Sequence, residues 1–153
     1  MRRINRVCLA ICIGLLFTGC GVSAPILDRL WPDAYWRSER YVVLEIDTSE
    51  EMSLHFDRPD QPGANDELVP PTVFAVGSDS HHIVVKQHPA AERAGRLTPD
   101  RTTTNYYIID RTDSLDVAAR KAGVHGPLTP ERFAELARAQ ALPAFSKVFP
   151  EVQ

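Results

Sequence analysis

Alternating apolar and polar positions predict two strands in the first half of the chain. Residues 41–47 read YVVLEID, with Val42, Leu44 and Ile46 on one face, and residues 52–57 read MSLHFD with the same alternation. A period of two is typical of strands, and the short TSEE segment between them favours a hairpin. We therefore expect an antiparallel pair with one buried face and one solvent-exposed face.

A second hairpin and a fifth strand are predicted in the middle of the chain. Residues 70–89 read PPTVFAVGSDSHHIVVKQHP, and a loop at residues 77–80 would place Phe74 opposite Ile83. Because both faces of this hairpin would carry apolar cross-strand pairs, we expect it at the centre of the sheet. Residues 104–110, TNYYIID, supply the fifth strand.

The last third of the chain changes to helical periodicity. Asp113 or Ser114 can cap a short helix over LDVAARKA, and Gly123 is placed to end it. Thr129 can cap a second helix with Pro130 at its first position. The predicted fold class is therefore α+β: a mainly antiparallel sheet of about five strands, made of two hairpins plus one strand, followed by two short C-terminal helices.

The start of the chain has three zones. Residues 1–6, MRRINR, are positively charged, residues 7–17 carry no charged side chain, and small residues follow around Cys20. This order is typical of an export signal. As a helix, the apolar zone would reach roughly half of a ~30 Å hydrocarbon core, which is too short for a comfortable membrane span.

Residues 17–20, FTGC, resemble the lipobox of bacterial lipoproteins, whose usual form is Leu, a small residue, Gly or Ala, then Cys. Phe17 departs from the common Leu, and Thr18 is a less usual second residue. The resemblance implies lipidation of Cys20 by a diacylglyceride, cleavage before it and acylation of the new amino group. An ordinary secretory signal with a coincidental cysteine, or an uncleaved short anchor, is the alternative.

The lipobox resemblance also implies the domain organisation and the compartment. Residues 1–19 would be the signal peptide, residues 20–33 the lipidated N-terminus and tether, and residues 34–153 a single globular domain. The protein would be anchored to a membrane through Cys20. Because Gly21 stands where Asp would signal retention at the inner membrane, the expected location is the outer membrane, facing the periplasm, if the host has two membranes.

Cleavage would change the cysteine count and the net charge. Cys8 and Cys12 would leave with the signal peptide, so the mature domain would hold neither a free thiol nor a disulfide. The chain has 17 basic and 20 acidic residues, and removing Arg2, Arg3 and Arg6 shifts the net charge from −3 to −6. A mildly acidic domain with no basic cluster is a poor candidate for binding nucleic acid.

Five histidines raise the question of a metal or catalytic site. Adjacent histidines in a strand point to opposite faces, and no spacing such as HExxH or HxH selects a metal site. Surface or turn positions explain these histidines better, and the alternative is a small periplasmic metal-binding module or hydrolase that uses them. They are His55, His81, His82, His88 and His125.

Ser53, His55 and Asp57 have the composition of a catalytic triad. Neighbours two apart on a strand are ~6.5 to 7 Å apart, too far for a hydrogen-bonded relay with ordinary side-chain geometry. Glu50 and Glu51 lie near the tip of the first predicted hairpin, where solvent would keep them from general acid work. We therefore predict no catalytic, cofactor or metal site.

Three polar segments are the places where binding would most easily occur: residues 58–66, 77–80 and 90–103. Four aromatic residues are possible contact groups, although their contexts are more typical of a core or a sheet face. They are Trp31, Trp36, Tyr106 and Tyr107.

Residues 41–111, with the segments VGSD, VVKQHP and YYIID, resemble a family of small, functionally uncharacterised bacterial secreted proteins and lipoproteins. The resemblance implies a compact exported domain and no activity. We therefore expect a non-enzymatic envelope lipoprotein that binds a protein partner. Two versions are an immunity protein that blocks an incoming toxin and a subunit of an envelope complex.

Overall fold

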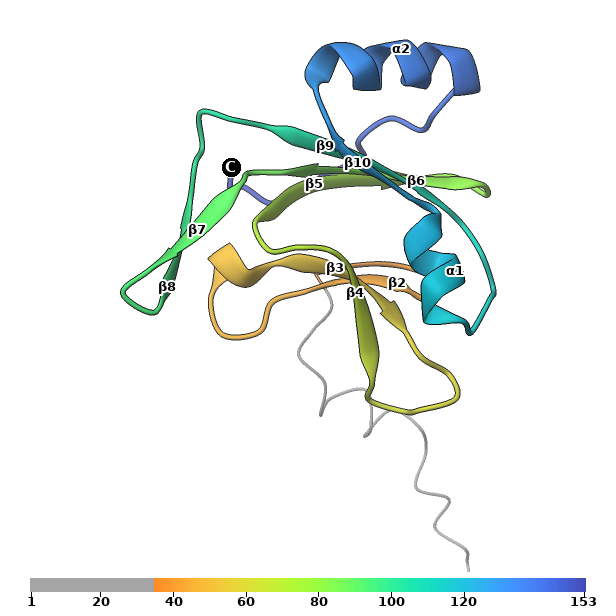
Figure 1. Ribbon diagram of the computed structural model, residues 1–153, viewed down its shortest axis with the longest axis horizontal. Coiled ribbons are helices and arrows are strands. Elements are labelled where there is room, and N and C mark those ends of the chain that lie inside the picture. Colours follow the sequence, from red (N-terminus) through yellow and green to blue (C-terminus); the bar gives the residue numbers. More distant parts are fainter. Residues whose placement is uncertain (1–34) are drawn as a thin grey trace, which may run out of the picture. The chain divides into compact units, whose positions relative to one another are not determined.

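Two larger antiparallel sheets, a separate two-stranded hairpin, two α-helices and a 3-10 turn at Ser49–Glu51 form this computed structural model, which describes residues 35–153 (Figure 1). The predicted signal peptide, Cys20, the tether and Trp31 lie outside the described residues. The first sheet has the order β1-β2-β3-β4. Its strands are β1 (Trp36–Ser38), β2 (Tyr41–Leu44), β3 (Ser53–Asp57) and β4 (Asn65–Val69).

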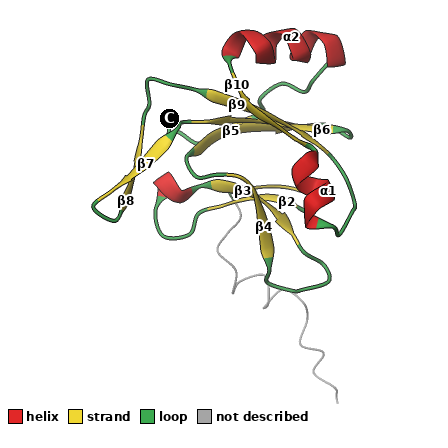
Figure 2. Ribbon diagram, viewed as in Figure 1, coloured by secondary structure: helices red, strands yellow, loops and turns green. Residues whose placement is uncertain are grey.

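The second sheet has five strands in the order β10-β9-β6-β5-β11, and a separate hairpin of β7 and β8 extends away from it (Figure 2). These strands are β5 (Val73–Ser78), β6 (His82–Gln87), β7 (Ala90–Arg93), β8 (Arg96–Pro99), β9 (Asn105–Asp110), β10 (Val124–Leu128) and β11 (Lys147–Val148). The predicted α+β class with mainly antiparallel pairing is confirmed. The first predicted hairpin, however, belongs to the four-stranded sheet, whereas the second hairpin and the fifth strand form the centre of the five-stranded one.

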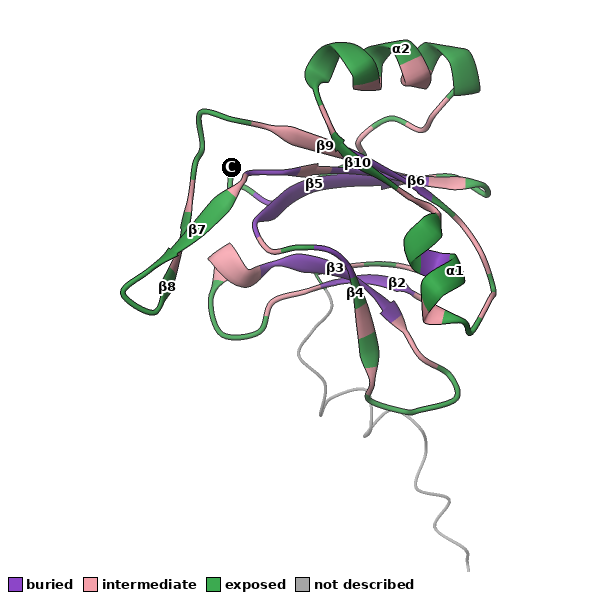
Figure 3. Ribbon diagram, in the orientation of Figure 1, coloured by how far each residue is buried: buried purple, intermediate pink, exposed green. Residues whose placement is uncertain are grey.

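The core lies between the two sheets, which face each other (Figure 3). Leu54 and Phe56 project from the four-stranded sheet, and Ile83 and Ile109 project from the five-stranded one, each no more than 1% exposed. Phe149 near the C-terminus is buried among them. Burial of apolar surface between two sheets is the main source of stability in such a fold.

The turn between β5 and β6 is tighter than the sequence pattern predicts. Ser78 pairs with Ile83, so the strands continue to the turn at residues 79–81, and the predicted pairing of Phe74 with Ile83 is wrong. The Asp79 carboxylate accepts hydrogen bonds from the backbone N–H groups of His81 and His82, both at 2.8 Å. These two bonds stabilise the short turn.

The expectation of a solvent-exposed face on the first hairpin is also wrong. Val42 is 1% exposed although it lies on the face opposite the core. The ion pair between Arg37 on β1 and Asp57 on β3, at 3.2 Å, spans β2 on this face. Ile46, which was predicted to continue the strand, lies beyond the end of β2 and is 67% exposed.

The first helix, α1 (Val117–Ala122), begins later than predicted. Asp116, not Asp113 or Ser114, caps it by accepting a hydrogen bond from the N–H of Ala118 at 2.9 Å, and Gly123 ends it as expected. The helix contacts β4 and β10, and thereby lies against one strand of each sheet.

The second helix, α2 (Pro130–Gln140), begins at the predicted cap. Thr129 accepts a hydrogen bond from the N–H of Arg132, and Pro130 occupies the first turn. The helix lies on the side of the five-stranded sheet that faces away from the four-stranded sheet (Figure 1). The ring of Phe133 stacks on that of Tyr106 at 4.7 Å, which fixes the helix to β9. Within residues 35–153, no helix has the length and apolar character needed to cross a membrane.

Candidate functional site

A pocket of about 270 Å³ lies between α2 and the five-stranded sheet. Ile108 on β9 and His125 on β10 are paired across the strands, so their side chains share the face beneath the helix. From α2, three residues spaced four apart line the pocket, because this spacing places them on one helical face. The full lining is Ile108, His125, Leu128, Arg132, Leu136 and Gln140.

The two ionisable side chains that line the pocket, Arg132 and His125, already have acidic partners. A terminal guanidinium nitrogen of Arg132 lies 2.6 Å from Glu135 on the same helix. The Nε2 atom of His125 lies 2.9 Å from Oδ2 of Asp110, at the end of β9. An incoming ligand therefore meets apolar side chains beside two ionisable groups that already have hydrogen-bond partners.

The hydrogen bond to Asp110 determines which ring nitrogen of the neutral His125 carries the proton. A carboxylate oxygen only accepts hydrogen bonds, so Nε2 of His125 must be the donor. In the neutral ring, Nδ1 is then an acceptor. No hydrogen-bond partner of Nδ1 is found among residues 35–153.

Asp110 also lies next to His82, its cross-strand partner at the start of β6. The ring nitrogens of His82 lie 3.9 Å from the Asp110 carboxylate and 4.0 Å from that of Asp79. Hydrogen bonds from two backbone N–H groups of the turn lower the pKa of Asp79, which keeps it charged. Within the described part of the chain, no group of three or more His, Cys, Asp or Glu side chains is arranged to hold a metal ion.

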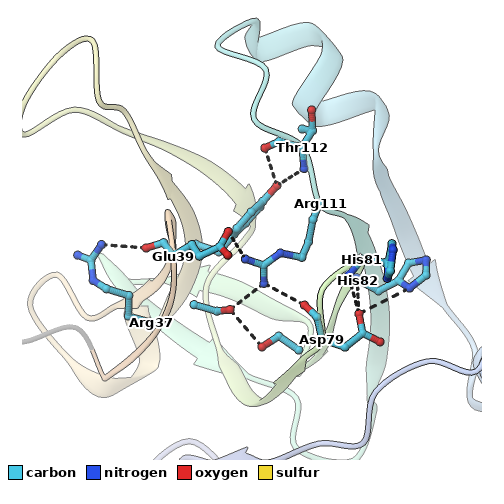
Figure 4. Close-up of polar contacts among 10 residues, drawn as sticks. Arg37, Glu39, Asp79, His81, His82, Arg111 and Thr112 are labelled. Atoms are coloured by element: carbon cyan, nitrogen blue, oxygen red, sulfur yellow. Dashed lines mark hydrogen bonds and ion pairs between the residues drawn. The ribbon is translucent and has the colours of Figure 1, made fainter.

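Arg111 connects the two sheets near the same turn (Figure 4). Its guanidinium donates to the Ser38 hydroxyl and the Glu39 carboxylate, both at 2.7 Å, and to the Asp79 carbonyl at 3.2 Å. The guanidinium also lies 5.3 Å from the centre of the Tyr41 ring. These contacts join β1, β2 and the β5–β6 turn, so Arg111 has a structural role.

Ser53 and His55 form a buried hydrogen-bonded pair, with 2.7 Å between Oγ and Nε2. The expectation that residues two apart on a strand are too distant for such a bond is wrong for these two, because the side chains lean along the strand toward each other. Asp57 does not complete a triad, since its carboxylate pairs with Arg37 at 3.2 Å. Burial lowers the pKa of His55 and favours its neutral form.

His88 is a second buried histidine. It is 4% exposed, its ring stacks on Phe74 at 4.3 Å, and its Nδ1 atom lies 2.7 Å from the carbonyl oxygen of Thr103. The predicted surface or turn placement is therefore wrong for His55 and His88, and it is confirmed for His81 and His125. His88 and Thr103 flank the segment that contains β7 and β8, and the contact between them brings its two ends together, so the role of His88 is structural.

The predicted binding segments are only partly loops, whereas the candidate aromatic residues of the described chain lie in the core or on a sheet face as expected. Residues 58–64 are a loop, but β4 begins at Asn65, and the segment at residues 90–103 contains the hairpin of β7 and β8. Trp36 and Tyr107 pack in or against the core, and Tyr106 lies on the sheet face beneath α2, as expected. Glu51 accepts a hydrogen bond from the N–H of Asp47 at 2.9 Å near the tip of the first hairpin.

Asp110, Arg132 and Gln140 belong to the site, although the predictions from the sequence do not include them. Asp110 ends the strand TNYYIID and His125 follows 15 residues later, and no sequence spacing shows that β9 and β10 are neighbours. The repeat of four from Arg132 through Leu136 to Gln140 was a usable signal for a common helical face.

A family model described as "Protein of unknown function (DUF3997)" matches residues 38–144. The match includes α1 and α2, which lie outside the 41–111 segment that carries the sequence resemblance. No curated protein and no solved structure matches the chain.

Proposed function

Since the chain belongs to this uncharacterised family, we propose a function from its own residues: it is a lipid-anchored envelope protein that binds another protein at the pocket between α2 and the five-stranded sheet. The proposal has two parts, an anchor at Cys20 and a binding site on the folded domain. Each part has its own support and its own experiment.

The anchor is supported by the order of residues at the start of the chain. A basic segment, a short apolar segment and a cysteine among small residues occur together in residues 1–25. Two or three acyl chains on Cys20 would hold the domain firmly, whereas one chain gives only marginal binding. In a host with two membranes, Gly21 favours the outer membrane and the periplasmic side.

The binding site is supported above all by the pocket. Its lining combines the apolar side chains of Ile108, Leu128 and Leu136 with polar groups from α2 and β10. Binding energy at protein interfaces is concentrated where one side chain fills such a pocket. Because α2 supplies half of the lining and is fixed to β9 by the stacked rings of Phe133 and Tyr106, the site is formed before a partner arrives.

A binding role is favoured over catalysis by the way the reactive side chains are used. Ser53 and His55 are buried with each other, and the carboxylate two residues further is held by Arg37. His88 connects two segments of backbone and is stacked on Phe74. These contacts explain the polar groups as parts of the fold.

The anchor is tested by metabolic labelling with an alkyne fatty acid in the host. We expect label on the wild-type protein, no label on Cys20→Ser, and accumulation of the uncleaved precursor when signal peptidase II is inhibited by globomycin. Equal labelling of wild type and Cys20→Ser, or recovery of the wild-type protein from the soluble fraction without label, would contradict the anchor.

The binding site is tested by capture from detergent-solubilised membranes with a tagged full chain. We expect one protein to be enriched with the wild type, to be lost with Leu136→Arg, and to capture this chain when it carries the tag itself. Arg58→Ala, in a loop outside the pocket, is the control that should retain capture. Retention of the same protein by Leu136→Arg would place the interface elsewhere and overturn this part.

A further inference from the structure

We propose that the pocket takes the side chain of a tyrosine or tryptophan of the partner protein. The ring would lie against Ile108, Leu128 and Leu136, and its O–H or N–H group would donate a hydrogen bond to His125. This inference rests on the proposed function, since it names the group that the same pocket recognises.

The charges at the pocket favour a neutral occupant. Arg132 is paired with Glu135 at 2.6 Å, and the neutral ring of His125 donates a hydrogen bond to Asp110 at 2.9 Å. A carboxylate entering the pocket would have to displace Glu135 from Arg132 and would lie near the like charge of Asp110, whereas an ammonium group would lie near the like charge of Arg132. A neutral side chain leaves both pairs intact and loses no charge hydration on entry.

The hydrogen bonding favours an occupant that donates. Because Nε2 of His125 donates to Asp110, Nδ1 of the neutral ring is an acceptor, and the described residues supply no donor to it. A tyrosine hydroxyl or an indole N–H supplies that donor. Phenylalanine and leucine fill apolar space but offer Nδ1 no donor.

The size and lining favour a single ring. A volume of about 270 Å³ is below the usual range of about 300 to 1,000 Å³ for sites that enclose a whole small ligand. Tyrosine and tryptophan combine a large apolar body with one polar group, and they are enriched where interface energy is concentrated. The pocket has the matching arrangement, with three aliphatic side chains beside the Nδ1 acceptor of His125.

The test uses the full lipidated chain in detergent micelles, labelled at isoleucine and leucine methyl groups for NMR. The probes are N-acetyl-tyrosinamide, its O-methyl ether, which lacks the donor, and N-acetyl-tyrosine, which carries a carboxylate. We expect N-acetyl-tyrosinamide to shift the methyl signals of Ile108 and Leu136 and to bind about threefold to tenfold tighter than its O-methyl ether, the range of one neutral hydrogen bond. N-acetyl-tyrosine should bind no tighter than the amide.

Variants test whether the preference arises at His125. His125→Phe should bind the phenol and its ether equally, because the acceptor is removed while a ring is kept. His81→Phe, which replaces an exposed histidine of the β5–β6 turn, should keep the preference of the wild type. Both substituted residues are exposed, so each variant should fold.

Equal affinities of the phenol and the ether for the wild type, tighter binding of the carboxylate, or the absence of methyl shifts at any probe concentration would each overturn the inference. These outcomes are separate from the test of the proposed function. If Leu136→Arg still abolishes capture of the partner, the binding site stands while its assignment to an aromatic donor fails. If capture does not depend on Leu136, the proposed function fails as well.

Discussion

Replacing Asp66 by alanine is expected to leave a buried positive charge without its partner. Arg120 on α1 is 1% exposed, and its guanidinium forms an ion pair with the carboxylate of Asp66 on β4. The same guanidinium donates to the carbonyl of Ser114 at 2.6 Å and lies 4.3 Å from the centre of the Phe56 ring. This one side chain therefore holds α1 against the four-stranded sheet.

The expected loss follows from the burial of the pair. Removing one member of a buried ion pair costs about 3 to 5 kcal/mol, because the remaining charge stays desolvated. Arg120 would keep the Ser114 carbonyl and the Phe56 ring, so we expect Asp66→Ala to lower the free energy of unfolding by about 3 kcal/mol, the lower end of that range. The control is Glu135→Ala, which removes an ion pair that is more than half exposed and should cost about 0.5 kcal/mol or less.

A double variant separates the charge from the packing. Asp66→Leu combined with Arg120→Met removes both charges and keeps apolar volume over Phe56, so it should recover at least half of the loss. The assay is urea unfolding of the full chain in mild detergent, followed by circular dichroism. Asp66→Ala within about 1 kcal/mol of the wild type, or a double variant as unstable as the sum of its single variants, would refute the reasoning.

Four further variants test other contacts by urea unfolding. Gly77→Ala should lower stability by about 2 to 3 kcal/mol, the upper part of the range for overpacking, because its Cβ would collide with the backbone carbonyl oxygen of Ala144. Gly95→Ala, with no heavy atom within 4 Å and a φ of +73°, should cost only about 1 kcal/mol, and equal losses for the two variants would contradict the expected collision. Thr129→Ala removes the cap of α2 and should cost about 1 kcal/mol, with faster amide exchange at the start of the helix, and unchanged exchange there would be evidence against the cap. Burial lowers the pKa of His55, so below about pH 6.5 the unfolded chain binds a proton that the folded chain does not. The free energy of unfolding should therefore fall as the pH drops below about 6.5, by at most about 1.4 kcal/mol per pH unit. His55→Gln should show a shallower fall, and an unchanged slope would contradict the assignment of this pH dependence to His55.

Local signals in the sequence predicted the elements that local contacts determine. Thr129, Pro130 and Gly123 were sufficient to place the start of α2 and the end of α1, because caps act within a few residues. The alternation over residues 52–57 likewise identified β3. The short polar strands β1, β4, β7 and β8 carry no such signal, since their pairing is set by neighbours elsewhere in the chain.

Alternation shows which side of a strand is apolar, but it does not show what covers either side. The alternation therefore placed Val42 in a hairpin with one buried face and one solvent-exposed face. In the structure, Val42 is buried on the face opposite the core, so both faces of the hairpin are covered there. The candidate site depends on two such non-local facts: the pairing of β9 with β10, which joins Asp110 to His125, and the return of α2 over the sheet. Neither fact can be read from a single sequence.

Under the proposed function, the anchored protein acts through contacts made at the pocket beside α2. The most direct measurement is photocrosslinking in living host cells from a benzoylphenylalanine placed at Gln140, which lines the pocket. The account predicts one membrane-associated adduct from this position, lost when Leu136→Arg is added and absent when the crosslinker is placed at Glu92 in the exposed β7 strand. An adduct that persists with Leu136→Arg, or one that forms from Glu92 and not from Gln140, would contradict it.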